Sequence, residues 1–552
     1  MLGYLLIISL LEILAYKQGG VCSAIASRIW LFTGIFCFIV FLYRVVVQVV
    51  TDIKERQLFV SIGYLLLIIF LFYFIGNVNY SDINADAAQQ VAAGLDSFHY
   101  NDWNYTGIAF LGYANRQYII AALPALIFGR NIFTLHMGFA SLFFIGLTMM
   151  FLEFRNWLKL HNLSENLALF PVYAIVAFRF IAEYYMNFEQ AITPVCLTMI
   201  GIALFMKIYR RPDVLTVISL SWVGCFYCDS YTPVLASLGL LGIFILLYII
   251  KIIKDNKEVI SQEKLKCKEM PLIKVLLGIE INMVLFFVAT ILLKRSDRIS
   301  ETREDVSLVP FALESWGEFF SDSNAIFLGV FSGIVIFYLF LSFLGRLKLY
   351  DVMISAWVLG VILFSNYMVG YTTYEKSWIL QRNMIVIPVL VTGIFLAFID
   401  ILKRQGINLT KSIELVVIVM LAFLAFCNFK MPHQSFVYFQ NIQPMKYMIS
   451  YSQKLVKEHG LTAEDEFNLL LITDNILQSN IYDYATFFYP NAHAVSTTSG
   501  EYMQDLNYEL PTIVIGESEE TVSMYCNKVE QVEYNNPRYQ TTEEWYGGVL
   551  EN

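Results

Sequence analysis

Apolar stretches long enough to cross a bilayer recur along most of this chain. The hydrocarbon core of a membrane is about 30 Å thick, so a spanning helix needs roughly 20 apolar residues. Backbone polar groups in lipid must be bonded within the segment, which favours helices. The expected fold class is therefore an all-α polytopic membrane protein with about 13 transmembrane helices. The spans are expected at residues 2–16, 29–50, 58–76, 132–153, 166–182, 191–207, 212–227, 231–252, 275–294, 326–345, 352–368, 384–402 and 412–428.

The composition supports the same class and excludes several others. Of the 552 residues, 57% are hydrophobic and only 15% are charged, whereas soluble domains carry about 25% charged residues. This hydrophobicity also excludes an intrinsically disordered chain. The net charge of −9 and the lack of a basic stripe argue against nucleic-acid binding.

Basic connections alternate with less basic ones along the chain. Because Lys and Arg are enriched in cytoplasmic loops, we expect the basic connections in the cytoplasm. They comprise residues 51–57, 153–166, 207–213, 251–274, 346–351 and 403–411. The opposite set comprises 17–28, 77–130, 183–190, 228–231, 295–324, 369–383 and everything after 428. The N-terminus is therefore predicted inside and the C-terminus outside.

Two of the outer segments are too long to be simple connectors. Residues 77–130 are acidic, aromatic and partly apolar, which suits interfacial helices lying on the membrane. Residues 429–552 lack the membrane composition and carry 17 acidic against 6 basic residues, which suits a small extracytoplasmic α/β domain. In this domain a helix is expected at 445–458 and strands at 469–473 and 512–515. The expected division is two extra N-terminal helices in 1–57, a transmembrane core in 58–428 and the C-terminal domain in 429–552.

Two carboxylates stand at the start of the first outer loop. Asp82 and Asp86 are four residues apart, so on a helix they share one face. The Ala-rich stretch that follows favours such a helix, with Ser81 or Asp82 as its N-cap. Two interpretations are open: one Asp caps the helix while the other faces water, or both belong to a site at the membrane surface.

Three further segments of this loop complete a pattern. They are Asp-Trp-Asn-Tyr-Thr-Gly from Asp102, Gly-Tyr-Ala-Asn-Arg-Gln-Tyr from Gly112 and Leu-Pro-Ala-Leu-Ile-Phe-Gly-Arg-Asn from Leu123. An acid on the first outer loop, an aromatic loop and Leu-Pro…Phe-Gly-Arg before the next span resemble the GT-C membrane glycosyltransferases. The most similar branch comprises the protein O-mannosyltransferases and the lipid A aminoarabinose transferases, which use polyprenyl-phosphate-linked sugars. The resemblance in architecture covers residues 58–428.

The resemblance implies a catalytic base on the first outer loop. Asp86 matches that position, with Ala87 in place of the second acid that is common in the family, so Asp82 is the expected partner. A second acid is usual in the next outer loop, where Glu189 stands at the start of a span. Glu189 fits equally well as an acid that complements a helix dipole.

Transfer from a polyprenyl phosphate also calls for cations that stabilise the departing phosphate. Lys376 and Arg382 stand just before a span on the outer side and are the candidate partners, Arg382 in bidentate fashion. Both also fit side chains that snorkel to the interface. Arg116 is the one Lys or Arg between residues 77 and 129, and it either orients a carboxylate of the substrate site or neutralises the loop.

Two remaining polar groups occupy a predicted outer turn. Asp229 and Tyr231 are candidates for lining the same cavity, although turn chemistry alone explains an Asp there. Cys225 and Cys228 form a Cys-x-x-Cys without a second pair or a His partner, so two small apolar residues in a helix are the preferred interpretation. We expect no obligate metal and no other cofactor.

Together these features predict a multi-pass glycosyltransferase of the bacterial plasma membrane, active on the exported face and involved in glycan biosynthesis for the cell envelope. Its expected partners are a polyprenyl-phosphate-linked sugar, a glycan, lipid or protein acceptor, and membrane lipids. The alternatives are a lipid-linked glycan transporter or flippase, and a polysaccharide polymerase or ligase. A transporter predicts ionisable groups deep in the spans, whereas here these groups concentrate outside the spans or near their ends, with Arg44, Arg179 and Glu280 as exceptions.

Overall fold

The protein is seen in a computed structural model, which describes part of the chain. The described residues are 21–77, 80–83, 87–88, 91–92, 95, 116–186, 192–210, 216, 387–388, 391–393, 395–396, 399, 411–430, 445–473, 481–497, 506–507, 509–537 and 540–550. The spans expected at 2–16, 231–252, 275–294, 326–345 and 352–368 lie outside these residues, and so does 212–227 apart from Thr216.

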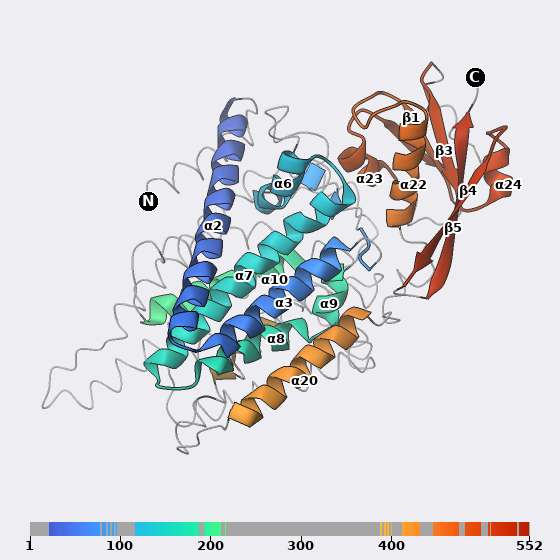
Figure 1. The fold of residues 1–552 in the computed structure, drawn as a ribbon. Coiled ribbons are helices and arrows are strands. Elements are labelled where there is room, and N and C mark those ends of the chain that lie inside the picture. Colours follow the sequence, from blue (N-terminus) through green and yellow to red (C-terminus); the bar gives the residue numbers. More distant parts are fainter. Residues whose placement is uncertain are drawn as a thin grey trace, which may run out of the picture.

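The described part of the transmembrane region is a set of packed helices (Figure 1). The long ones are α2 (Val21–Lys54), α3 (Leu58–Gly76), α7 (Ile132–Leu160), α10 (Ile192–Arg210) and α20 (Lys411–Lys430). Among the described helices, α3, α7 and α20 are long and apolar enough to cross a membrane. The chain is therefore an integral membrane protein, as its composition predicts.

Helix α3 shows how the apolar surface is divided. Tyr64 and Leu67 are buried against neighbouring helices, whereas Leu66 and Ile69 on the opposite face are exposed. In lipid, an exposed apolar side chain carries no hydrophobic penalty, so both faces of a spanning helix can be apolar. The inner face is further specified by a buried hydrogen bond of 2.5 Å between the hydroxyl groups of Tyr64 and Thr148 on α7.

A tight hairpin joins α6 (Arg116–Phe128) to α7. Gly129 has a φ of +83°, which suits a residue without Cβ, and Asn131 caps α7 by accepting from the Thr134 N–H at 3.0 Å. The two helices come so close that a Cβ on Gly138 would lie 1.8 Å from the Ala121 carbonyl oxygen. Small residues thus let the two backbones touch, as is common between membrane helices.

The span expected at 166–182 is not one helix. The chain forms η1 (Glu165–Ala168), α8 (Leu169–Val176) and α9 (Arg179–Met186), with a break at Ala177 and Phe178. At the break, the Ala177 carbonyl oxygen accepts a hydrogen bond of 2.5 Å from the Asn428 side chain of α20. A carbonyl released from a helix ladder is costly in an apolar surrounding, and this amide donor offsets the cost.

Ion pairs join the expected cytoplasmic connections at one end of the helices, which we call the far end. The Arg155 guanidinium donates to both oxygens of Asp52 at 2.7 and 2.8 Å and also binds Glu165. A second pair joins Arg210 to Glu153 at 2.7 Å. The connections 51–57, 153–166 and 207–213 thus share one end, as the predicted alternation requires.

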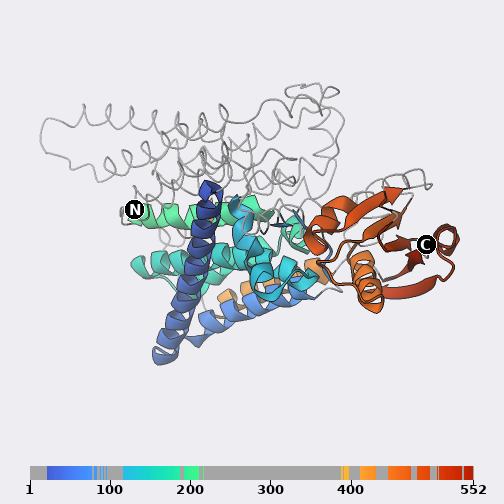
Figure 2. The same cartoon turned by 90° about the horizontal axis from the view of Figure 1, so that it is seen from above.

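The C-terminal part folds as a five-stranded sheet with helices on it (Figures 1 and 2). Its strands are β1 (Asn468–Ile472), β2 (His493–Thr497), β3 (Thr512–Gly516), β4 (Glu530–Asn536) and β5 (Thr541–Leu550), and its helices are α22 (Met445–Glu458), α23 (Ile481–Phe488) and α24 (Glu519–Ser523). The order is β2-β1-β3-β5-β4, in which β1 pairs parallel with β2 and β3, and β5 pairs antiparallel with β3 and β4.

Both faces of this sheet are covered. Leu469 and Leu471 belong to the apolar cluster that contains α22, whereas Leu470 and Ile472 belong to a second cluster that includes Val522 of α24. This explains why β1 is an unbroken apolar run, as is typical of parallel strands buried on both sides. The bounds predicted for α22 are confirmed, and the strands predicted at 469–473 and 512–515 differ from β1 and β3 by one residue.

Candidate functional site

The start of the first outer loop is held where α3 ends, α7 begins and α9 ends. We call this the domain end of the helices. In the segment Tyr80–Ile83, the Asp82 N–H donates to the Met186 carbonyl oxygen at 2.8 Å. On the other side, His136 of α7 contacts the Asp82 carbonyl oxygen through Nε2 at 3.0 Å and the Ser81 hydroxyl through Nδ1 at 3.0 Å.

These contacts determine the tautomer of a neutral His136. A carbonyl oxygen can only accept, so Nε2 carries the proton and donates to Asp82, while Nδ1 accepts from the Ser81 hydroxyl. His136 and Ser81 are both fully buried. The segment Tyr80–Ile83 is therefore fixed to α7 and α9 by its backbone and not merely placed beside them.

The Asp82 carboxylate points to backbone donors. Its Oδ1 accepts from the Ile83 N–H at 2.8 Å and lies 3.5 Å from the Lys446 N–H of α22. Residues 81–83 are not helical, and the Asp82 backbone is bonded to α7 and α9. Asp86, with which Asp82 is expected to share a helix face, lies outside the described residues.

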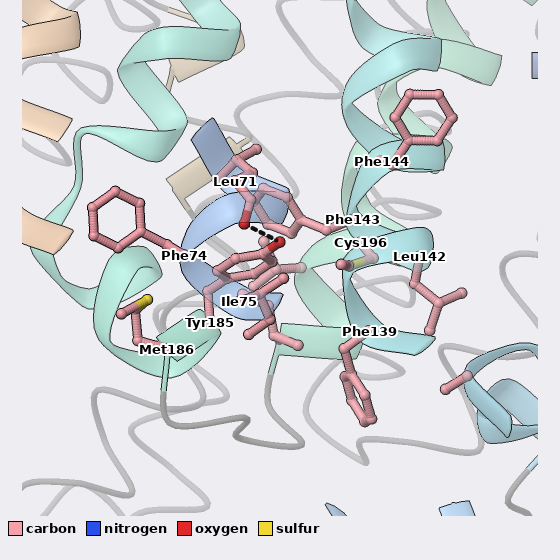
Figure 3. Close-up of a cluster of buried hydrophobic side chains, with 14 of the residues drawn as sticks. Leu71, Phe74, Ile75, Phe139, Leu142, Phe143, Phe144, Tyr185, Met186 and Cys196 are labelled. Carbon is pink, nitrogen blue, oxygen red and sulfur yellow. Dashed lines mark hydrogen bonds between the residues drawn. The ribbon is translucent and has the colours of Figure 1, made fainter. Parts of the chain in front are cut away.

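An aromatic and aliphatic cluster supports this segment from within the helices (Figure 3). The Tyr185 hydroxyl donates to the Leu71 carbonyl oxygen at 3.2 Å, and its ring lies 5.0 Å from that of Phe143. The buried residues labelled in the view are Leu71, Phe74, Ile75, Phe139, Leu142, Phe143, Phe144, Tyr185, Met186 and Cys196. This close packing fixes the ends of α3, α7 and α9 relative to one another.

The C-terminal domain lies against the same end. Figures 1 and 2 both place α22 and the sheet beyond the ends of α3 and α7. In addition to the approach of Lys446 to Asp82, the Arg130 guanidinium donates to the Phe487 carbonyl oxygen of α23 at 3.4 Å. Lys446 is itself buried, with 2% of its surface exposed, and its Nζ lies 4.9 Å from the centre of the Tyr447 ring.

Electrostatics connect these groups across the domain boundary. Burial, and after it the Asp82 carboxylate, raise the pKa of the Tyr447 phenol well above its ordinary value. The phenol keeps its proton and donates it to the Asn535 carbonyl oxygen of β4 at 3.3 Å. Asp82, Lys446 and Tyr447 thus form one charged and polar group between the membrane region and the sheet.

Of the residues predicted for the site, Asp82 is described with its side chain and Arg116 is placed as the first residue of α6. Asp86, Glu189, Lys376, Arg382, Asp229 and Tyr231 lie outside the described residues. The hydrogen bond between Asp82 and Met186 nevertheless joins the segments that lead directly into the predicted positions of Asp86 and Glu189. Two connections that are both expected on the outer side, and that lie far apart in the sequence, therefore meet at one point.

Sequence reasoning missed two residues at the domain end, His136 and Lys446. His136 shows no metal-ligand spacing with other histidines in the sequence, but its place in the first turns of a span, next to the loop motif, is a signal. Lys446 gave no signal, since a lysine in an amphipathic helix normally faces water. Within the part of the chain that is described, no cluster of three or more His, Cys, Asp or Glu side chains could hold a metal ion.

Comparisons with known proteins give one kind of match. No protein-family model matches the chain, and no curated protein matches it. Among solved structures, one that matches is ArnT from Cupriavidus metallidurans, in a crystal structure bound to undecaprenyl phosphate. It is 11% identical, with a TM-score of 0.49, and the match covers 88% of this chain and 98% of that chain.

Proposed function

We propose that this protein is an integral-membrane glycosyltransferase that moves a sugar from a polyprenyl-phosphate donor to an acceptor. The observation that carries the proposal is the bond between Asp82 and Met186 at the domain end. It brings together the two connections whose acids, Asp86 and Glu189, the sequence pattern nominates for catalysis. The motif resemblance of the first outer loop, residues 77–130, supplies the donor class.

The reaction is a single displacement at the anomeric carbon. An acceptor hydroxyl oxygen forms the new bond to this carbon while the bond from the carbon to the phosphate oxygen breaks, so the configuration inverts. Asp86 accepts the hydroxyl proton, and the electron pair of the broken bond leaves on the polyprenyl phosphate. Glu189 is the second acid at the same site.

The departing phosphate gains negative charge and needs positive partners. Lys376 and Arg382, predicted just before an outer span, serve this purpose, with Arg382 contacting two phosphate oxygens. Arg116 begins α6 and orients the donor or one of the carboxylates. Asp229 and Tyr231 line the same cavity. No metal is required by this scheme, and the acceptor is a glycan, a lipid or a protein.

The test uses full-length protein in lipid with labelled polyprenyl-phosphate hexoses. Release of free polyprenyl phosphate and transfer of label to acceptors are measured for the wild type, for Asp86→Asn and for Asp96→Asn. Loss of a positioned general base costs about 10²–10⁴-fold in rate, so Asp86→Asn is expected to lose at least about 10²-fold. Asp96→Asn changes another acid of the same loop and is expected to keep wild-type turnover.

Two outcomes would contradict parts of this proposal. Equal turnover in wild type and Asp86→Asn would remove Asp86 from the reaction and leave Glu189 as the candidate base. Tight donor binding without turnover, across several sugars, would favour the transporter. One feature of the fold favours that second candidate: the helix break between α8 and α9, since interrupted helices are common at transporter sites.

A further inference from the structure

The described residues contain a contact that the proposed reaction does not use. In it, the C-terminal domain meets the start of the first outer loop. We propose that Asp82 is a positioning residue that fastens the C-terminal domain to the loop through the first turn of α22. The inference deepens the proposed function, and it depends on that function only where turnover is measured. It assigns Asp82 a role other than that of a reacting acid.

The first argument is the direction of the Asp82 carboxylate. The first N–H groups of a helix have no partner within the helix, and an acid placed there satisfies and complements them. Asp82 Oδ1 lies 3.5 Å from the Lys446 N–H, in the first turn of α22, and holds the Ile83 N–H at 2.8 Å. Asp82 is thus an N-terminal partner of α22, supplied from another part of the chain.

The second argument is the rigidity of the Asp82 backbone. Its N–H is bonded to Met186 of α9 and its carbonyl oxygen to His136 of α7. A residue that positions another element must itself be held in place. Asp82 is held through both its N–H and its carbonyl oxygen. Asp82 therefore positions the start of α22 relative to α7 and α9.

The third argument is that the contact is continuous with a buried core. One apolar cluster runs from α3 and α7 to α22 and the sheet face that α22 covers. Lys446 and Met445 at the start of α22 are buried. Because linked domains share little buried surface unless they are docked, the shared cluster indicates a docked domain.

A separate hydrogen bond connects the C-terminal domain to the membrane helices. Arg130, which follows α6, donates to the Phe487 carbonyl oxygen near the end of α23 at 3.4 Å. The domain is thus fastened at two helices, α22 and α23, and the membrane side contributes one acid and one base. Fixing two points restricts rotation, which one contact cannot do.

Hydrogen–deuterium exchange on the full-length protein in lipid tests the contact between Asp82 and α22 without any substrate. The variants are Asp82→Ala, Asp82→Asn and Asp465→Ala. Asp465 is the matched control, because it also accepts a backbone N–H, from Thr462 at 2.6 Å, but in an exposed turn of the same domain. Residues 445–449 are expected to exchange about fivefold faster in Asp82→Ala, the size of a lost helix cap. In Asp82→Asn, which keeps an acceptor oxygen, and in Asp465→Ala they are expected to stay within about twofold of the wild type.

Unchanged exchange at 445–449 in Asp82→Ala would overturn the proposal. Because Asp82→Ala could simply unfold, Arg130→Gln is measured as well, and it is expected to raise exchange at residues 484–488 while the far end stays protected. Unchanged exchange there would also count against a docked domain.

Turnover then separates a positioning role from a catalytic one. If the wild type transfers sugar, Asp82→Ala is expected to lower kcat about tenfold, and Asp82→Asn is expected to restore most of it. A loss in Asp82→Asn as large as in Asp82→Ala would make Asp82 a reacting acid and overturn the assignment. If the wild type transfers no sugar, the proposed function fails, while the exchange measurement still decides whether Asp82 fastens the domain.

Discussion

Single residues at the far end show how charge is held inside this protein. Arg155 is 2% exposed and Asp52 is fully buried, and the two form a bidentate pair that also includes Glu165. The Ser61 hydroxyl donates to the same Asp52 carboxylate. Such a network is stabilising only while every member has its partners, because a buried charge left alone is costly.

Removal of Arg155 should therefore destabilise the membrane region strongly. Arg155→Met leaves Asp52 and Glu165 without their main partner, at a cost of about 3–5 kcal/mol. Thermal unfolding of the purified protein in detergent measures it. The control is Lys159→Met, which removes an ion pair to Glu165 made by a half-exposed lysine and should cost at most about 1 kcal/mol. Similar midpoints for the two variants would contradict the importance of the buried pair.

The Cys526 thiol gives a prediction about pH. Burial raises the pKa of this thiol to about 11, from an ordinary value of 9.0. Because the folded state prefers the protonated thiol, its contribution to stability is complete below pH 9.0 and is lost as the pH rises towards 11. Cys526 should resist iodoacetamide at pH 9.0 in the folded protein and react after denaturation. Mass spectrometry of the labelled peptides reads this out, and rapid labelling of folded protein would show that the thiol is accessible.

At the scale of elements, the sequence predicts helices well where the apolar run has clear polar ends. The bounds expected for α3 and α22 are those observed, and α7 begins where expected but extends to Leu160. The single helix expected at 166–182 is wrong, because the chain breaks at Ala177 and Phe178, where the free Ala177 carbonyl oxygen is bonded by Asn428, a residue 251 positions away. Hydropathy reports how apolar a segment is and carries no information about such a partner.

The hairpin of α6 and α7 allows a test of close helix packing. Gly138→Ala would drive a Cβ into the Ala121 carbonyl group, so the helices must separate, at a cost of about 1–3 kcal/mol. The matched control is Gly63→Ala in α3, whose Cβ would meet only the mobile end of the Leu169 side chain. The unfolding midpoints of both variants in detergent decide the matter: Gly138→Ala should be clearly the less stable.

At the scale of the whole molecule, the two ends of the membrane helices differ in the polar groups and the domain that they hold. The far end holds the buried ion pairs, and the domain end holds Asp82, His136 and the C-terminal sheet. If positive charge sets the orientation as predicted, the far end is cytoplasmic and the sheet is outside.

Labelling of introduced cysteines in intact cells tests this orientation. Glu55→Cys lies in the exposed turn after α2, and Lys528→Cys replaces a side chain that is 84% exposed in the C-terminal domain. A membrane-impermeant maleimide should label Lys528→Cys in intact cells, and Glu55→Cys only after the membrane is opened. The wild type, with its native cysteines, gives the background. The reverse pattern would place the domain in the cytoplasm and remove the proposed exported site.

The sequence by itself determined the class of protein, the apolar helices α3, α7 and α20, and helix α22 with strands β1 and β3 of the C-terminal domain. These depend on hydrophobicity, periodicity and turn residues, which act over a few neighbouring positions. It also nominated the first outer loop, through its acids and its motif. Only the tertiary structure decided the partners: Arg155 for Asp52 across 103 positions, and Lys446 for Asp82 across 364. A charged side chain in a sequence has many possible partners, and the packing of distant helices selects one of them by bringing it within bonding distance and excluding water.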